Sequence, residues 1–145
     1  MTKYRFSEGA ALVFGGSGGL GTGIVNLLAE SGSDVAFTYY KNKESAESNL
    51  KNIEGMGRSG LIGGVDLLDM TNVQNFVDET KEKFGRIHSV IFATGPFLHI
   101  MPVLEADPKD FYYTLDADIK GFYHVLRAVV PALKEGGGGS ITALT

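Results

Sequence analysis

A glycine-rich turn near the start of the chain limits its possible folds more than any other feature. The turn has the sequence GGSGGLG at residues 15–21, follows the apolar run Ala10–Phe14 and opens the helical pattern Gly19–Glu30. A strand that turns through glycines directly into a helix predicts the first half of a βαβ unit. Large apolar side chains share one face of the predicted helix: Leu20, Ile24, Leu27 and Leu28.

The alternation of apolar runs and amphipathic segments continues along the chain. Further strands are predicted at residues 35–39, 60–65, 90–93 and 140–144. Helices are predicted at residues 45–56, from the N-cap Asp69 to Phe84, and from the N-cap Asp107 with Pro108 at its first position, with a break near residues 116–118. With right-handed crossovers, residues 1–145 are expected to form one α/β domain. This is a Rossmann-type doubly wound parallel sheet with strand order 3-2-1-4-5 and helices on both faces.

Composition excludes several classes of function. The 145 residues are 43% hydrophobic and 21% charged, which is typical of a globular domain. The net charge is −4 without a stripe of Lys or Arg, so nucleic acid is not expected as a partner. The absence of cysteine excludes disulfides and thiolate zinc sites, and no metal site is expected. No apolar stretch reaches the ~18–20 residues that span a bilayer, and residues 1–9 lack a signal-peptide core, which favours a cytoplasmic protein without membrane contacts.

The glycine turn has the features of a phosphate-binding loop. A pyrophosphate approaches backbone N–H groups closely only where no Cβ intervenes, and the following helix directs its N–H groups and positive dipole end to the same place. Gly21 is expected to let this helix pack close to the sheet. The predicted dinucleotide contacts in this segment are Gly15, Ser17, Gly18, Gly19, Leu20 and Gly21.

Other interpretations of the turn are a flexible loop without a ligand and two alternative motifs. Gly15-x-Ser17-x-Gly19 also matches the nucleophile elbow of serine hydrolases, but no spacing favours a histidine as its base. The P-loop of ATPases requires Gly-Lys-Ser/Thr, and residues 21–23 lack the lysine. We interpret the three histidines as surface or core residues: His88, His99 and His124.

The segment after the second predicted strand favours NADP(H) over NAD(H). Proteins that bind NAD place an Asp or Glu there to hold the ribose hydroxyls, and that charge repels a 2′-phosphate. Here Tyr39 ends the strand, and residues 40–43 (Tyr-Lys-Asn-Lys) contain no acid. We expect Lys41 to bind the 2′-phosphate with Tyr40 beside it. The alternative is that Lys41 and Lys43 are solvated residues at a helix start.

A carboxylate follows the third predicted strand. Asp66 is expected to accept a hydrogen bond from the adenine amino group, with the N–H of Leu67 also at the ring. The alternative for Asp66 is a role in a turn or a helix cap.

Taken together, these segments resemble the short-chain dehydrogenase/reductase family along the whole chain and in register. Residues 14–21 match that family's Thr-Gly-x-x-x-Gly-x-Gly, and Asp66 matches its adenine-binding acid. Residues 84–87 lead into the fourth strand as they typically do in the family. Residues 118–121 occupy the segment that holds its catalytic Asn. Residues 92–95 take the place of its Asn-Asn-Ala-Gly, which adds three residues to the expected cofactor site: Ala93, Thr94 and Gly95.

The resemblance implies an NADP(H)-dependent oxidoreductase that transfers hydride between the nicotinamide and a small carbonyl or alcohol substrate. It places Asp118 where the family has its catalytic Asn, which holds a water in a proton relay. Phe14 replaces the Thr whose hydroxyl helps to order the loop, and only Gly95 of the Asn-Asn-Ala-Gly turn is kept. The catalytic Ser, Tyr and Lys of the family are expected beyond Thr145. A non-catalytic dinucleotide-binding or scaffold protein is the alternative.

The resemblance also implies a homo-oligomer, either a dimer or a tetramer, because the family packs its long helix against a partner subunit. We interpret residues 97, 98 and 100 (Phe, Leu and Ile) as one wall of the substrate pocket, and the last strand as an exposed edge that invites association. Tyr112, Tyr113 and Tyr123 are interpreted as packing residues of the long helix. The expected apolar stripe of that helix comprises Phe111, Leu115, Ile119, Phe122, Leu126, Val129 and Leu133, widened by Val125 and Val130 beyond one buried face.

Overall fold

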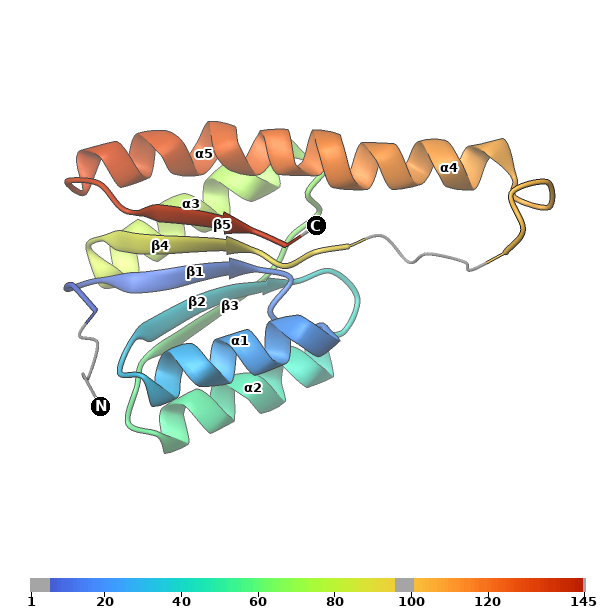
Figure 1. Cartoon of the computed structure of the whole chain (residues 1–145). Coiled ribbons are helices and arrows are strands. Elements are labelled where there is room, and N and C mark those ends of the chain that lie inside the picture. The colour runs from blue at the N-terminus through green and yellow to red at the C-terminus, as the bar shows by residue number, and fades with distance from the viewer. Residues whose placement is uncertain (1–5, 96–100, 145) are drawn as a thin grey trace.

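The computed structural model describes residues 6–95 and 101–144. Within them, parallel strands form one sheet with the order β3-β2-β1-β4-β5 (Figure 1). Helices α1 (Gly19–Glu30) and α2 (Lys43–Gly55) cover one face, and α3 (Met70–Phe84) and α5 (Gly121–Glu135) cover the other. The predicted fold class and strand order are confirmed, although β4 begins before the predicted residue 90. The strands are β1 (Ala10–Phe14), β2 (Asp34–Tyr39), β3 (Gly60–Gly64), β4 (Ile87–Phe92) and β5 (Ser140–Ala143).

The central strand β1 is apolar along its whole length because helices cover it on both sides. Each of its residues, Ala10–Phe14, is fully buried. Leu12 and Phe14 belong to the core that lies under α3 and α5, whereas Val13 belongs to the core under α1 and α2. The strand therefore joins the two cores and fixes the position of the turn that follows it.

Parallel pairing brings the carboxyl ends of the strands to one edge of the sheet. Phe14 of β1 pairs with Phe92 of β4, and Tyr39 of β2 pairs with Gly64 of β3. The turns that leave these strands therefore emerge at the same edge. The strand order reverses between β1 and β4, which is where doubly wound sheets bind their ligands.

Side-chain caps set the helix starts, and one start differs from the prediction. α2 begins at Lys43 rather than Ser45 because Asn42 Oδ1 accepts a hydrogen bond from Ser45 N at 3.1 Å. The predicted N-caps Asp69 and Asp107 are confirmed, since each carboxylate accepts hydrogen bonds from backbone N–H groups of its first turn.

Helix α1 buries a different face from the predicted one. Leu20 is 74% exposed and Leu27 is 63% exposed, so only Ile24 and Leu28 of the predicted apolar face pack against the core. Gly21, Val25 and Ala29 are buried instead. Because the helix begins so close to the end of β1, Gly21 faces the sheet and Leu20 lies on the exposed side.

The long helix after Asp107 runs past the edge of the sheet. α4 (Pro108–Leu115), the π-helical turn η1 (Asp116–Lys120) and α5 follow one another without interruption (Figure 1). The expected break at residues 116–118 is thus a π-helical turn and not a helix end. Figure 1 shows that α5 lies over the strands while α4 projects beyond them. The first half of the predicted stripe is therefore exposed in this chain: Phe111, Leu115 and Ile119.

Helix α5 uses its apolar residues differently from the prediction. Val125, expected to widen the stripe beyond one buried face, is fully buried against the sheet together with Val129 of the expected stripe. Ile119 and Tyr123, at 67% and 54% exposed, form the bare side instead. An ion pair between Lys81 of α3 and Glu135 fixes the far end of α5.

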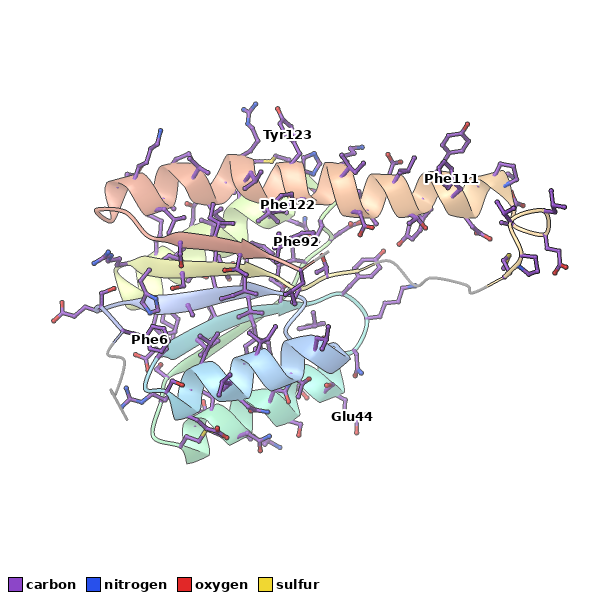
Figure 2. The ribbon with its side chains drawn as sticks, viewed as in Figure 1. Phe6, Glu44, Phe92, Phe111, Phe122 and Tyr123 are labelled. Atoms are coloured by element: carbon purple, nitrogen blue, oxygen red, sulfur yellow. The ribbon has the colours of Figure 1, made fainter. Side chains whose placement is uncertain are left out.

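His88 is a core residue of β4, as predicted. It is 5% exposed, its Nε2 lies 3.2 Å from Ser33 Oγ, and its Nδ1 lies 3.0 Å from Ser89 Oγ. The ring stacks on Phe6, with 5.1 Å between ring centroids (Figure 2). Burial, and after it the positive charge of Arg86, lowers the pKa of His88 below its usual value.

The lowered pKa of His88 predicts that the fold loses stability in mild acid. As pH falls below about 6.5, the unfolded chain binds a proton at residue 88 before the folded chain does. The contribution of neutral His88 is therefore complete above that pH and is lost as pH falls toward the folded pKa. We expect the urea midpoint of the wild type to fall more steeply than that of His88→Gln between about pH 7.5 and pH 5.5. Parallel slopes would contradict this assignment.

Candidate dinucleotide-binding site

The glycine turn leaves β1 in a conformation that suits glycine. Gly15 has a φ angle of +87°, in the left-handed region. Gly18 N donates to Gly15 O at 3.2 Å and closes the turn, and Thr22 N donates to Gly18 O at 2.8 Å and starts α1. Gly18 is the N-cap of α1. The turn thus carries the chain directly from a buried strand into a helix.

Packing within the chain also requires glycine at positions 16 and 21 of the turn. A Cβ at Gly16 would lie 2.6 Å from Phe37 Cβ. A Cβ at Gly21 would lie 2.8 Å from the carbonyl carbon of Gly15, 2.9 Å from Gly16 Cα, and closer still to the Gly15 carbonyl oxygen. Gly21 therefore allows α1 to begin in contact with the end of β1, as expected.

Gly18 and Gly19 form the open part of the turn. Both are exposed, and a Cβ at Gly19 would have no atom of the described residues within 4 Å. Packing in this part of the chain thus gives no reason for a glycine at position 19. Gly18 has no side chain to cap α1, and the first turn of α1 contains no acidic residue, so its leading N–H groups are left for another acceptor. Open space above these N–H groups, at the positive end of a helix, fits a pyrophosphate.

Side chains from β2 and α2 hold the turn in shape. Gly15 N donates to Thr38 Oγ1 at 3.0 Å, so a hydroxyl of the neighbouring strand holds the start of the turn. Ser45 Oγ donates to Ser17 O at 3.1 Å, and Asn49 Nδ2 donates to Gly16 O at 3.1 Å.

Sequence reasoning missed these three residues, although one of them left a signal. Asn49 lies on the face of α2 that also carries Ala46 and Ile53, at helical spacing, and a polar residue within an apolar stripe calls for a buried partner. Thr38 and Ser45 gave no comparable signal, because hydroxyl side chains are common both in strands and in first helical turns.

Tyr40 and Lys41 follow β2 at the same edge of the sheet. Both are exposed, and Lys41 Nζ lies 5.5 Å from the centroid of the Tyr40 ring. Lys43 belongs to α2 and pairs with Glu47 at 3.4 Å along the helix surface. Lys43 is therefore a solvated residue at a helix start, which was the alternative considered for both lysines. The 2′-phosphate role of Lys41 stays a prediction.

Asp66 and Leu67 follow β3. Asp66 Oδ1 accepts a hydrogen bond from Leu68 N at 2.9 Å, so the turn role considered for this carboxylate is present. Leu67 O accepts from His124 Nδ1 at 2.7 Å, which ties the loop to α5. Val65 N donates to Tyr39 O at 2.9 Å, so this loop leaves the sheet beside the end of β2. The adenine contacts of Asp66 and Leu67 stay predictions.

The residues after β4 contact the glycine turn. Ala93 N donates to Phe14 O at 2.9 Å, which extends the pairing of β1 and β4. A Cβ at Gly15 would lie 2.7 Å from Thr94 Cγ2, so Thr94 packs directly on the turn, and Gly95 beyond it is exposed. The predicted pocket wall at residues 97, 98 and 100 lies outside the described residues, as does His99.

Asp118 lies in η1, one turn before the start of the packed part of α5. Phe122, near the start of α5, contacts Phe92 at the end of β4, with 4.8 Å between ring centroids (Figure 2). This contact holds the start of α5 over the carboxyl edge of the sheet. Partial desolvation raises the pKa of Asp118 above its usual value. Its catalytic role stays a prediction.

The other candidate side chains lie apart from the turn. His124 is engaged with Leu67 O, and His88 lies near the amino end of β4, so neither is placed as a base for Ser17. Three tyrosines of the long helix are 53–64% exposed, so they lie outside the core of this chain, and their packing role stays a prediction: Tyr112, Tyr113 and Tyr123.

Two kinds of feature are absent from residues 6–95 and 101–144. That part of the chain holds no cluster of three His, Asp or Glu side chains suited to a metal ion. It also contains no helix with the length and apolarity needed to cross a bilayer.

A parallel sheet with a glycine turn at its switch point defines the Rossmann class, and comparison with known proteins identifies the family. The family model for short chain dehydrogenases matches residues 9–145. The chain belongs to this family.

Relatives with curated names and solved structures agree with this assignment. Hydroxynaphthalene reductase from Aspergillus fumigatus is 32% identical over 110 residues, which cover 76% of this chain and 40% of that protein. A short chain dehydrogenase from Burkholderia cenocepacia in complex with NADP is 32% identical with a TM-score of 0.86, and the match covers 97% of this chain and 56% of that one. An NAD+-bound xylitol dehydrogenase is 26% identical with a TM-score of 0.90, over 97% and 54%. The chain thus spans about half or less of the length of these relatives.

Proposed function

We propose that this chain forms the cofactor-binding half of an NADP(H)-dependent oxidoreductase that acts on a carbonyl or alcohol substrate. The observation that carries the proposal is the open pair Gly18 and Gly19 at the start of α1, where packing within the described chain does not require glycine. Membership of the short chain dehydrogenase family supports it. When bound, the nicotinamide supplies the hydride, and the protein supplies orientation and electrostatics.

Different residues along one sheet edge bind different parts of the dinucleotide. The N–H groups at the start of α1 hold the pyrophosphate, and Ser17 and Leu20 flank it. Asp66 and Leu67 contact the adenine ring, and Lys41 with Tyr40 holds the 2′-phosphate. Residues 93–95, which pack on the turn, bound the nicotinamide end of the site.

Proton transfer requires groups that residues 1–145 do not hold at the family's positions. We propose that the catalytic Ser, Tyr and Lys belong to sequence beyond Thr145. Asp118 takes the place of the family's Asn, and its carboxylate accepts a hydrogen bond from the relay water. Because partial desolvation favours its neutral form, its ability to accept is lost at a higher pH than for an ordinary Asp.

We also propose that the protein is a homo-oligomer. The exposed side of the long helix has a shallow depression lined by Leu115, Asp116, Ile119, Lys120 and Tyr123, three of which are exposed apolar or aromatic residues. Exposed apolar surface of this kind marks interaction sites. Strand β5, at the edge of the sheet in this chain, is a second exposed surface.

Replacing Lys41 tests the choice of cofactor. Lys41→Ala removes a charge-assisted hydrogen bond to the 2′-phosphate, so we expect about tenfold or greater weakening of NADPH binding and little change for NADH. Dissociation constants from fluorescence titration of both cofactors give the answer. Lys43→Ala is the matched control, because that lysine pairs with Glu47 on α2. Equal losses for the two cofactors would contradict the role of Lys41.

A further inference from the structure

The shape of the glycine turn depends on helix α2. Asn49 is 4% exposed, and its Nδ2 group donates to both Gly16 O at 3.1 Å and Thr22 Oγ1 at 3.0 Å. One amide therefore binds the turn and the first helical turn of α1 together. Ser45, one turn earlier on α2, binds the next carbonyl of the loop, Ser17 O.

These contacts set the direction of the loop's peptide groups. In a trans peptide the C=O and the following N–H point in opposite directions. Because the carbonyl of Gly16 is directed at Asn49, the N–H of Ser17 points away from α2. The bond thus helps to fix the ψ angle of Gly16, a residue type that itself restricts the backbone least.

The same helix continues directly from the segment that carries Lys41. Asn42 caps α2, and its Oδ1 accepts from the N–H of Ser45, the residue whose hydroxyl binds Ser17 O. The expected 2′-phosphate contact and the glycine turn are therefore joined through the first two turns of α2.

We infer that Asn49 is a positioning residue for the dinucleotide, acting through the glycine turn without touching the cofactor. The inference rests on the proposed function. It implies that Asn49 supports the pyrophosphate, which NAD and NADP share, and so affects both cofactors by the same factor. This distinguishes Asn49 from Lys41, whose expected effect is confined to NADP(H).

Titration of NADP+ and NAD+ into the Asn49→Leu protein tests the inference. Leucine has a similar size but cannot donate to Gly16 O. We expect both dissociation constants to rise by a similar factor, about tenfold. The matched control is Asn52→Leu, an exposed asparagine of the same helix, which should bind both cofactors as the wild type does. A folded Asn49→Leu protein with unchanged affinities, or a loss for NADP+ only, overturns the inference.

A second variant decides the question if Asn49→Leu does not fold. Ser45→Ala removes the bond to Ser17 O from a half-buried position, and we expect a smaller loss of affinity, again shared by NAD+ and NADP+. Unchanged affinities in Ser45→Ala then overturn the inference. A wild-type protein that binds neither dinucleotide contradicts the proposed function itself, and the inference falls with it.

Discussion

The Gly21→Ala protein should be severely destabilised, with a urea midpoint far below that of the wild type. The added methyl group would lie within 3 Å of the Gly15 carbonyl carbon and of Gly16 Cα, and these backbone atoms cannot rotate away as a side chain can. Relief requires α1 or the end of β1 to move, and overpacking of this kind costs about 3 kcal/mol or more. That is a large share of the roughly 5–15 kcal/mol that stabilises a domain. Urea denaturation of both proteins measures the difference.

Gly23→Ala is the matched control for this experiment. Gly23 lies on the same helix and is exposed, and a Cβ there would meet no described atom within 4 Å. Alanine is the better helix former by about 1 kcal/mol, so this variant should be slightly more stable than the wild type. If Gly21→Ala were as stable as Gly23→Ala, α1 would not begin against the end of β1.

The Gly19→Val protein should fold and yet fail to bind NADPH. The space above Gly19 holds no described atom within 4 Å, so the fold accepts a side chain there. A pyrophosphate on the N–H groups of α1 would meet the valine methyl groups, and the loss of several hydrogen bonds to charged oxygens should weaken binding at least 100-fold. Fluorescence titration gives the affinity, and the urea midpoint shows that the fold is kept.

Gly23→Val provides the comparison for Gly19→Val. It places the same side chain on the same helix, one turn further from the proposed pyrophosphate position, and should bind NADPH normally. Retention of NADPH affinity in Gly19→Val would show that the cofactor does not lie over the glycine turn. Loss of affinity in both variants would point to a general disturbance of α1.

The sheet could be predicted from sequence because its strands carry strong local signals. Fully apolar runs such as Ala10–Phe14 alternate with helical patterns, and right-handed crossovers leave few strand orders. The helix caps Asp69 and Asp107 could also be predicted, because a cap is a contact between near neighbours in sequence.

The packed faces of the helices could not be predicted in the same way. In α1 the largest apolar residues were expected to face inward, but the close approach at Gly21 selects Val25 and Ala29 and leaves Leu20 outside. In the long helix the apolar pattern continues through Phe111 although no strand lies beneath α4. Periodicity identifies an apolar face, but the neighbouring elements decide whether it is covered.

In the candidate site, too, local features could be predicted from sequence and contacts between distant segments could not. The glycine turn and its neighbours at the sheet edge follow from local sequence and topology. The side chains that hold the turn come from positions distant in sequence: Thr38 is 23 residues from Gly15, and Asn49 is 33 residues from Gly16. Contacts over such separations exist only once the sheet has formed, so a local pattern can mark Asn49 as a residue that needs a partner but cannot identify the partner.

A crystal structure of the protein with NADP+ would show where the dinucleotide lies on the chain. The pyrophosphate should lie over the N–H groups at the start of α1, at Gly18 and Gly19, with the 2′-phosphate within hydrogen-bond distance of Lys41 Nζ. A dinucleotide bound elsewhere on the chain, with the glycine turn bare, would contradict the account.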